Sequence, residues 1–443
     1  MSHIWVGWAG AIAFAFFCSS LAQAASSNPS LPTSPESLSV AVSAVIERSL
    51  STYPILSQRR AEKEAAGQEA ASAWWGRFPS LSAIGRREEK TEITDRTVRL
   101  SLPLWASGGI QARINETRAR AEAAEAEVLS SQQAVIVQAG ELFFDLLRLE
   151  HAVLVAAENL QEHQRLVDLI ERRVKSEYSP AADLVIARSR LQLAVSEEIQ
   201  VIRQRDTTLS TLQQFLGEPL HAVIGPHRPT WITQALEQRI ESDTQRRETE
   251  EWVTRARTFS PELLQSRKRE VAAAAEVTAV RARALPRLSL VYEHNWRSEG
   301  QLNEDEGLTF MLVQIDTGAG LSAVDSVRAA QSRRVAAQES ISLLERQLAA
   351  QTRNLLLDTE SFRSEIVPAR IASQATADTM ASTLRQYQIG RKGWLDVLNA
   401  QREKTQALFS LADVVFRYEK SRLRLGAITG DIRPDRLGDI RGQ

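Results

Sequence analysis

The chain repeats itself, and this internal duplication limits its possible folds more than any other feature of the sequence. Pro54 in the first half is followed 25 residues later by Pro79, and Pro261 in the second half is followed 25 residues later by Pro286. The two pairs are offset by 207 residues, and a leucine stands two positions after each proline. A repeat of this length indicates that one structural unit occurs twice in the chain.

The later part of the repeat keeps an offset of 213 residues: Asp183 matches Asp396, and Gly217 matches Gly430. The six additional residues fall within one segment, between residue 286 and about residue 320. We therefore expect a signal peptide at residues 1–24, a first structural repeat at 25–217, a linker at 218–258, a second repeat at 259–430 and a tail at 431–443.

The first residues have the composition of an export signal. Residues 4–17 carry no charge, and residues 22–24 form the small-x-small motif that signal peptidase recognises. This apolar stretch is too short to cross a bilayer as a helix, which needs about 20 residues. An uncleaved membrane anchor stays open as an alternative. Cys18, the only cysteine, lies inside this leader behind the bulky Phe17, so we expect neither lipidation nor a disulfide in the mature chain.

Composition argues against nucleic-acid binding and against catalysis. The chain has 54 basic and 55 acidic residues, a net charge of −1, so no global field attracts a polyanion. The sequence contains no phosphate-binding loop, no H-E-x-x-H and no G-x-S-x-G motif. The six histidines are scattered, and His163 is expected to be a polar residue of the core. We predict no cofactor, no metal and no enzymatic activity.

Very long helices are the main predicted elements. From Gly109 to Pro180 only Gly140 weakens the helical pattern, a stretch of about 70 residues or about 105 Å. The second half repeats the pattern, and Pro368 is expected to interrupt it. Apolar residues spaced three or four apart form a seam that requires partner helices. In the first half the seam is Leu142, Leu146, Leu149, Val153, Ala156, Leu160, His163, Val167, Ile170 and Val174.

Two predicted strands precede each long helix. Val98, Leu100 and Leu102 alternate with polar residues, which gives a strand one apolar face. The second half has a similar strand from Leu288 and another over residues 308–315 that contains Phe310 and Leu312. Each is about nine residues long, as a tilted transmembrane strand requires. Soluble hairpins are the alternative.

Four strands are too few to close a barrel. In lipid, each unpaired backbone group at an open sheet edge costs several kcal/mol. If these hairpins enter a membrane, strands from several copies of the chain must therefore share one barrel. The same oligomer supplies partners for the helical seams.

Taken together, these motifs resemble the TolC-type outer-membrane efflux proteins. The matching residues are the strand entries at 79–81 and 286–288, the strand exit Leu-Pro-Leu-Trp-Ala-Ser-Gly-Gly at 102–109, and the segment at 387–401. The last segment fits the family pattern Y-x-x-G-x-x-x-x-x-D-V-L-x-A-Q. The resemblance implies a mainly α protein with a small transmembrane β part. Three copies would form a 12-stranded barrel in the outer membrane and an α-helical tunnel across the periplasm.

The resemblance also assigns candidate residues at the periplasmic entrance. Asp396 and Asn399 match the positions that narrow the pore, and they share one helix face at i and i+3. Because the second position is an amide, a trimer would have three carboxylates there instead of six. Asp396 as an ordinary acidic residue at a helix N-terminus stays open. Tyr387 and Lys392 match residues that tether the closed entrance, although packing alone also explains Tyr387.

The two turns between long helices match the family's contacts with a periplasmic adaptor. The candidate residues are Glu177 and Pro180 in the first turn and Gly390 and Gly393 in the second. Glu177 departs from the family pattern, which has glycine in that turn.

The predicted function is passive conduction through an outer-membrane exit duct for tripartite efflux or type I secretion. The implied partners are two further copies of the chain, a periplasmic adaptor, an ABC or proton-driven transporter of the inner membrane, and outer-membrane lipid, with no nucleic acid. The cargo stays open, and the missing lipid anchor favours protein secretion over drug efflux. The alternative is a soluble periplasmic coiled-coil scaffold or adaptor.

Overall fold

The computed structural model describes residues 35–88, 93–224, 248–299, 302–316, 318–319 and 322–433. The expected signal peptide, part of the expected linker and nearly all of the expected tail lie outside these residues.

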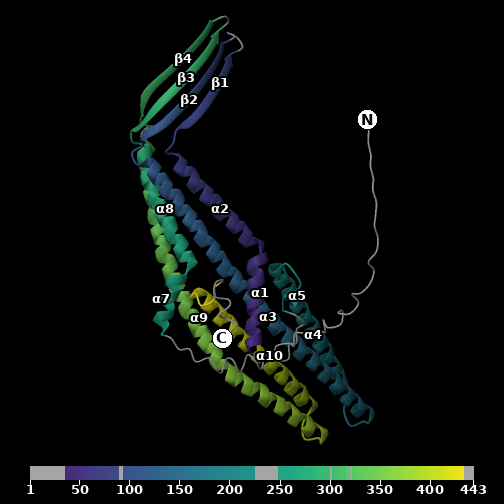
Figure 1. The fold of residues 1–443 in the computed structure, drawn as a ribbon. Helices are drawn as coiled ribbons and strands as arrows, with labels where there is room; N and C mark the ends of the chain where they lie inside the picture. Colours follow the sequence, from purple (N-terminus) through teal and green to yellow (C-terminus); the bar gives the residue numbers. More distant parts are fainter. Residues whose placement is uncertain are drawn as a thin grey trace, which may run out of the picture.

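The described chain passes twice through the same order of elements (Figure 1). The first set comprises α1 (Pro35–Thr52), α2 (Pro54–Trp75), β1 (Ser80–Glu88), β2 (Ile93–Trp105), α3 (Gly109–Lys175) and α4 (Ala181–Leu216), followed by the short α5 (Leu220–Ile224). The second set comprises α7 (Thr249–Phe259), α8 (Pro261–Arg283), β3 (Arg287–Glu299), β4 (Leu302–Gln314), α9 (Ser322–Gln388) and α10 (Trp394–Ile428). The expected linker at 218–258 thus contains α5 and most of α7.

The repeated prolines stand at the starts of elements. Pro54 and Pro261 occupy the first helical positions of α2 and α8, where the missing N–H would have no partner in any case. Pro79 and Pro286 immediately precede β1 and β3. Each half therefore turns from its helix into its hairpin at the same point.

Helices α3 and α9 are 67 residues each, or about 100 Å, and run from the sheet to the opposite tip. The expectation that Pro368 interrupts the second helix was wrong, because α9 continues through it. Packing of α9 against α8 and then α10 outweighs the single backbone hydrogen bond that proline removes. The nearby Ile366 is buried in the core.

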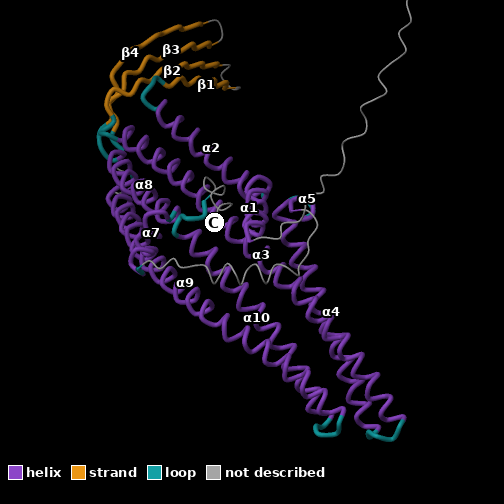
Figure 2. Tube along the Cα trace, turned by 60° about the horizontal axis from the view of Figure 1, so that its bottom comes forward, coloured by secondary structure: helices purple, strands orange, loops and turns teal. Residues whose placement is uncertain are grey.

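The helices lie side by side in a curved layer (Figure 2). Near the sheet the neighbours are α2, α3, α8 and α9 in that order, and toward the tip they are α4, α3, α10 and α9. The main core lies in the middle, where Phe143, Phe416 and Tyr418 are fully buried. Gly140 permits this packing, since a Cβ there would lie 2.4 Å from a methyl carbon of Leu423 on α10.

Ion pairs join neighbouring helices along the bundle. Pairs such as Lys420 with Asp145 and Lys404 with Glu158 join α10 to α3 at 2.8 Å. Exposed pairs of this kind each contribute about 0–1 kcal/mol, so they set the register between helices more than the stability.

The four strands form one antiparallel sheet in the order β1-β2-β3-β4. The two predicted hairpins thus join through β2 and β3. β1 has the expected nine residues, and the other strands have 13. The strands of one copy do not close into a barrel, and β1 and β4 remain as edges.

Candidate functional site

The two faces of the sheet differ in chemistry. Side chains of paired residues on neighbouring strands point to the same side of the sheet, so the pairing register assigns each side chain to one of the two faces. We call the first side the apolar face: it carries Leu81, Val98, Leu100, Leu102, Leu288, Leu290, Tyr292, Met311 and Val313, and nearer the outer end of the sheet it also carries Arg96, His294 and Asp305. The second side, the polar face, carries Ser82, Thr97, Arg99, Ser101, Ser289, Glu293 and Asn295, and among them the apolar Ile84, Val291, Leu308, Phe310 and Leu312. Arg99 and Glu293 form an ion pair there at 2.6 Å.

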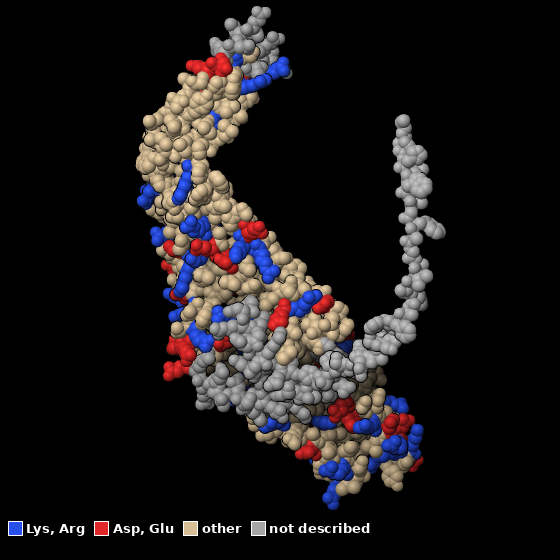
Figure 3. Space-filling view, viewed as in Figure 1, with Lys and Arg blue, Asp and Glu red and all other residues tan. Residues whose placement is uncertain are grey.

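The apolar band on this face is slightly shorter than the band of about 25 Å that a transmembrane barrel presents to lipid. Exposed Trp105 lies opposite Leu288 at the helical end of the band, and exposed Trp296 lies at the other end. Leu288 and Trp296 are about 27 Å apart along β3 at about 3.4 Å per residue, and a tilt of about 40° leaves about 21 Å. Charged side chains in the visible part of the sheet gather mainly near its outer end (Figure 3). Because a charge facing lipid is costly, the apolar face is suited to meet lipid and the polar face is suited to line a water-filled interior.

Both sides of the protomer present open edges. β1 and α2 lie at one edge, and β4 and α9 lie at the other (Figure 1). Large apolar side chains on these helices are exposed, including Trp75 on α2 and Leu343, Leu357 and Ile371 on α9. One copy therefore leaves both backbone pairing and helix packing unfinished at the same two edges.

The two turns at the far tip share one backbone design. In the second turn the Gly390 N–H donates to the Tyr387 carbonyl at 3.0 Å, and the Arg391 N–H donates to the Gln386 carbonyl at 2.8 Å. Glu177 and Tyr178 make the same two bonds in the first turn at 3.0 and 2.9 Å. This is the Schellman motif, which requires a left-handed residue.

The left-handed position distinguishes the two turns. Gly390 has φ +78°, which glycine adopts without strain, and Glu177 has φ +60°. A side chain at this φ costs about 1–2 kcal/mol. The first turn therefore stores strain that the second turn lacks.

Asp396 caps α10 and is also exposed at the tip. Its Oδ2 accepts a hydrogen bond from the Gly393 N–H at 2.9 Å. Its counterpart Asp183 cannot make this bond, because Pro180 replaces Gly393 and has no N–H. Asn399 is exposed one turn farther along the same face of α10. Asp396 therefore caps the start of α10 and is also exposed at the surface of the tip.

Tyr387 joins the two turns within one chain. Its side chain is 5% exposed and packs on Trp394, with ring centroids 5.4 Å apart. The guanidinium carbon of Arg173 lies 4.7 Å from the centre of the Tyr387 ring, and the tyrosine hydroxyl lies 3.4 Å from Ser179 Oγ. We call Arg173, Ser179, Tyr387 and Trp394 the tip latch. Lys392 lies outside it and is exposed on the second turn.

A buried polar network lies above the latch. Asn159 Oδ1 accepts hydrogen bonds from Gln401 Nε2 and Thr405 Oγ1, both at 3.0 Å, and Asn159 Nδ2 donates to Glu197 at 3.3 Å. Gln401 is the final residue of the sequence motif, and it is 2% exposed. The network fixes the register of α10 against α3 and α4.

Buried titratable groups lie in the middle of the bundle, away from the tip. Burial raises the pKa of Glu150 to about 7, against a smaller opposing effect of Arg205. Burial lowers the pKa of His151 and of His163, and Arg190 lowers the pKa of His163 further. His163 is a buried core residue, as predicted. Within the described ranges no three acidic, histidine or cysteine side chains gather as metal ligands.

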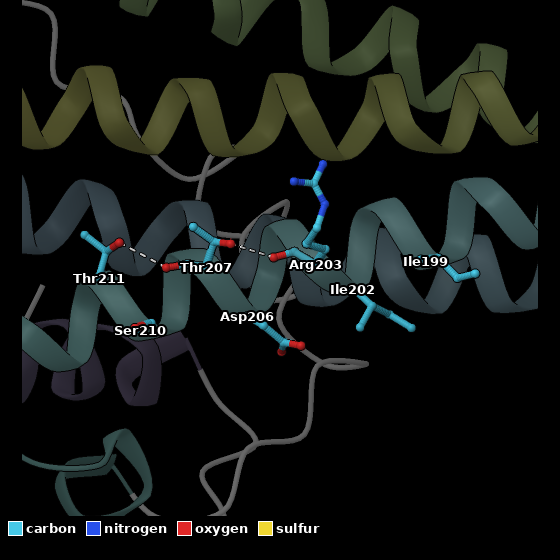
Figure 4. Close-up of a pocket in the computed structure, with 7 residues that line it drawn as sticks. All are labelled: Ile199, Ile202, Arg203, Asp206, Thr207, Ser210 and Thr211. Atoms are coloured by element: carbon cyan, nitrogen blue, oxygen red, sulfur yellow. Dashed lines mark hydrogen bonds between the residues drawn. The ribbon is translucent and has the colours of Figure 1, made fainter.

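A shallow hollow runs along α4 (Figure 4). Its two threonine hydroxyls are occupied by its own helix: Thr207 donates to the Arg203 carbonyl at 2.9 Å, and Thr211 donates to the Thr207 carbonyl at 3.0 Å. The charged side chains of Arg203 and Asp206 point in different directions (Figure 4), so they do not converge on one ligand position.

Long helices that carry a sheet with one apolar band are the architecture of a membrane channel. Among the described helices none is both long enough and apolar enough to cross a membrane. The outer membrane efflux protein family model matches residues 45–218 and 252–431. The chain belongs to this family.

Solved structures with the same fold include two described as outer-membrane channels, OprN and CmeC, and the outer membrane protein VceC. OprN is 19% identical, with 88% of this chain and 90% of OprN covered and a TM-score of 0.75. VceC from Vibrio cholerae is 17% identical, with 88% and 96% covered and a TM-score of 0.73. CmeC from Campylobacter jejuni is 14% identical, with 88% and 85% covered and a TM-score of 0.73. No curated protein matched the chain in a sequence search.

Family membership settles the broad predictions. The protein is an outer-membrane efflux channel that extends into the periplasm, and it conducts passively instead of catalysing a reaction. The mainly α fold with a small β part is confirmed, and the soluble scaffold is not supported.

The structure brings all eight candidate site residues to one tip. Asp396, Asn399, Tyr387, Lys392, Glu177, Pro180, Gly390 and Gly393 all lie in or beside the two turns. Sequence analysis missed Arg173, Ser179 and Trp394. Trp394 lies inside the matched motif and was available as a signal, whereas Arg173 lies 214 positions before Tyr387 and carries no local pattern.

Proposed function

We propose that the chain works as a homotrimer whose α-helical tip forms a gated periplasmic entrance. The observation that carries this proposal is the pair of open edges. One edge of the protomer carries β1 and α2, and the other edge carries β4 and α9. The β4 edge of one copy can therefore pair with the β1 edge of the next copy, and repeating this contact closes a ring.

The number of copies follows from the width of the barrel. Two copies would give eight strands, and side chains fill the interior of a barrel of about that size. Three copies give 12 strands, the smallest multiple of four with room for a lumen. The ring also covers the exposed apolar side chains of α2 and α9.

Asp396 and Asn399 are proposed to narrow the entrance. Three Asp396 carboxylates around one axis attract cations, and three neutral Asn399 amides add no charge to that ring. The tip latch holds the α9–α10 turn to the α3–α4 turn within each copy, so its release is required for the turns to separate. Lys392, exposed beside the latch, is positioned to contact the neighbouring copy.

The exposed turns are proposed to bind a periplasmic adaptor. Glu177 and Pro180 offer one surface, and Gly390 and Gly393 offer the other. The family name implies efflux, and a passive duct needs an energy source, so an ABC or proton-driven transporter of the inner membrane is the expected third component.

Gel analysis and conductance test this proposal. Purified protein is expected to migrate as a heat-resistant trimer on mild gels and to conduct in planar bilayers. Replacing Asp396 by Asn keeps a cap oxygen and removes the charge, so preference for cations is expected to fall. Adding Tyr387→Ala is expected to raise conductance.

Asp183→Asn is the matched control, because Asp183 occupies the equivalent position in the first turn. It is expected to leave ion preference unchanged. Monomers found only in the soluble periplasm would overturn the trimeric duct. An inserted channel that is unchanged by the Asp396 and Tyr387 substitutions would overturn the gate assignment alone.

A further inference from the structure

The polar face of the sheet has an apolar strip along one strand. The register pairs Phe310 with Val291 and Leu308 with Glu293, so both β4 side chains share the face of the Arg99–Glu293 ion pair. Leu312 lies two positions farther along the same face. We call Leu308, Phe310 and Leu312 the lumen strip.

The duplication shows that this strip is a departure from the common pattern. Leu81 on β1 corresponds to Leu288 on β3 in the sequence repeat. Leu81 pairs with Leu100 on β2, and Leu288 pairs with Val313 on β4. Leu100 and Val313 are therefore equivalent positions, and they are 213 residues apart. The equivalents of the lumen strip on β2 are Asp95, Thr97 and Arg99.

The lipid-facing positions do not show this difference. Val98 and Leu100 on β2 correspond to Met311 and Val313 on β4, and all four are apolar. The two sequence repeats therefore differ on the interior side of the strand, where β2 is polar and β4 is apolar. A requirement of the membrane cannot cause this change, because the affected side chains do not face lipid.

The strip is accessible within the protomer and is bordered by charge. Leu308 is 48% exposed, Phe310 39% and Leu312 40%, whereas Val291, beside Phe310 on β3, is 1% exposed. Leu308, Glu293 and Arg99 form one row across three strands. An apolar surface beside an ion pair matches a molecule that has an apolar body and a charged group.

We propose that the lumen strip is a binding site for small amphiphilic molecules in transit through the barrel. This inference rests on the proposed trimeric duct, in which the strip occurs three times around the lumen. Weak binding at several such sites favours entry without trapping the cargo.

Block of the ionic current by tetraalkylammonium ions tests the site. The ions, from tetraethyl to tetrapentyl, carry the same charge and differ in apolar size. They are added to planar bilayers on the side of the sheet's outer end. The wild-type channel is expected to bind the longer ions more tightly. Phe310→Thr, which installs the residue found at the equivalent Thr97, is expected to weaken tetrapentylammonium block about tenfold.

Two further variants keep the test decisive. Met311→Thr changes the adjacent lipid-facing residue and is expected to leave block unchanged. Thr97→Phe places an aromatic ring on the interior side of β2 and is expected to tighten block, so it tests the site without adding a polar group. Conducting wild-type channels whose block is independent of alkyl length would overturn the lumen strip. Wild-type protein that never conducts would instead overturn the duct.

Discussion

Loss of Arg173 is expected to favour opening of the entrance. Its guanidinium lies over the Tyr387 ring, a partly buried cation–π contact worth about 1 kcal/mol. If opening breaks the contact in all three copies, Arg173→Ala removes about 3 kcal/mol from the closed state. At about 1.4 kcal/mol per factor of ten, the ratio of open to closed channels rises about 100-fold. The assay is the open fraction of single channels in planar bilayers at low voltage.

Three comparisons identify the contact responsible. Arg172→Ala changes an exposed neighbouring arginine and is expected to have no effect. Tyr387→Phe keeps the ring and loses only a hydroxyl contact of 3.4 Å, so a change below about threefold is expected. Adding Arg173→Ala to Tyr387→Ala is expected to bring little further opening, since both remove one interaction. If Arg173→Ala leaves the open fraction at the wild-type value while Tyr387→Ala raises it, the role of Arg173 is refuted.

Three other substitutions test the bundle. Glu177→Gly relieves a left-handed residue and, after the entropy cost of glycine, is expected to stabilise the trimer by about 0.5–1 kcal/mol; an unchanged dissociation temperature on gels would contradict this. Gly140→Val is expected to displace Leu423 and destabilise by about 1–3 kcal/mol, seen as a lower dissociation temperature. Because the folded pKa of Glu150 is about 7 and its ordinary value is 4.5, the protonated carboxyl contributes stability that is fully present below about pH 4.5 and is lost as pH rises through 7. This pH dependence is worth at most about 3 kcal/mol, and Glu150→Gln is expected to remove it. The measurement is the dissociation temperature at pH 5 and at pH 8. A wild-type protein with equal dissociation temperatures at both pH values would contradict the prediction.

The long helices and their turns were predictable because local signals specify them. Gly109 and Pro180 bracket a pattern without strong breakers, and the structure places α3 and its turn between them. Pro368 was misjudged because the rule for proline is local, whereas the packing that keeps α9 continuous comes from segments distant in the sequence.

The interior of the sheet was not predictable from alternation. β4 is apolar on both faces over residues 310–313, so a period of two gives no information about which face Phe310 takes. Only the pairing with β3 decides this. The tip latch was hidden for a related reason, because Arg173 and Tyr387 meet through folding and not through spacing.

The role of Asp396 shows a different limit. Sequence reasoning offered a pore-narrowing acid or an acidic residue at a helix start as competing interpretations. The hydrogen bond to Gly393 supports the second without excluding the first, since the residue is also exposed. The Asp396 carboxylate can therefore cap α10 and still present its negative charge at the tip.

The equal lengths of α3 and α9 set how far the tip extends from the sheet into the periplasm. Deleting seven residues from one helix would offset its turn from the other by about 10 Å, far more than the latch can span. Matched deletions in both helices would keep the turns level and shorten the distance from the membrane to the mouth. Adaptation to a wider or narrower periplasm therefore requires paired changes in the two halves of the gene.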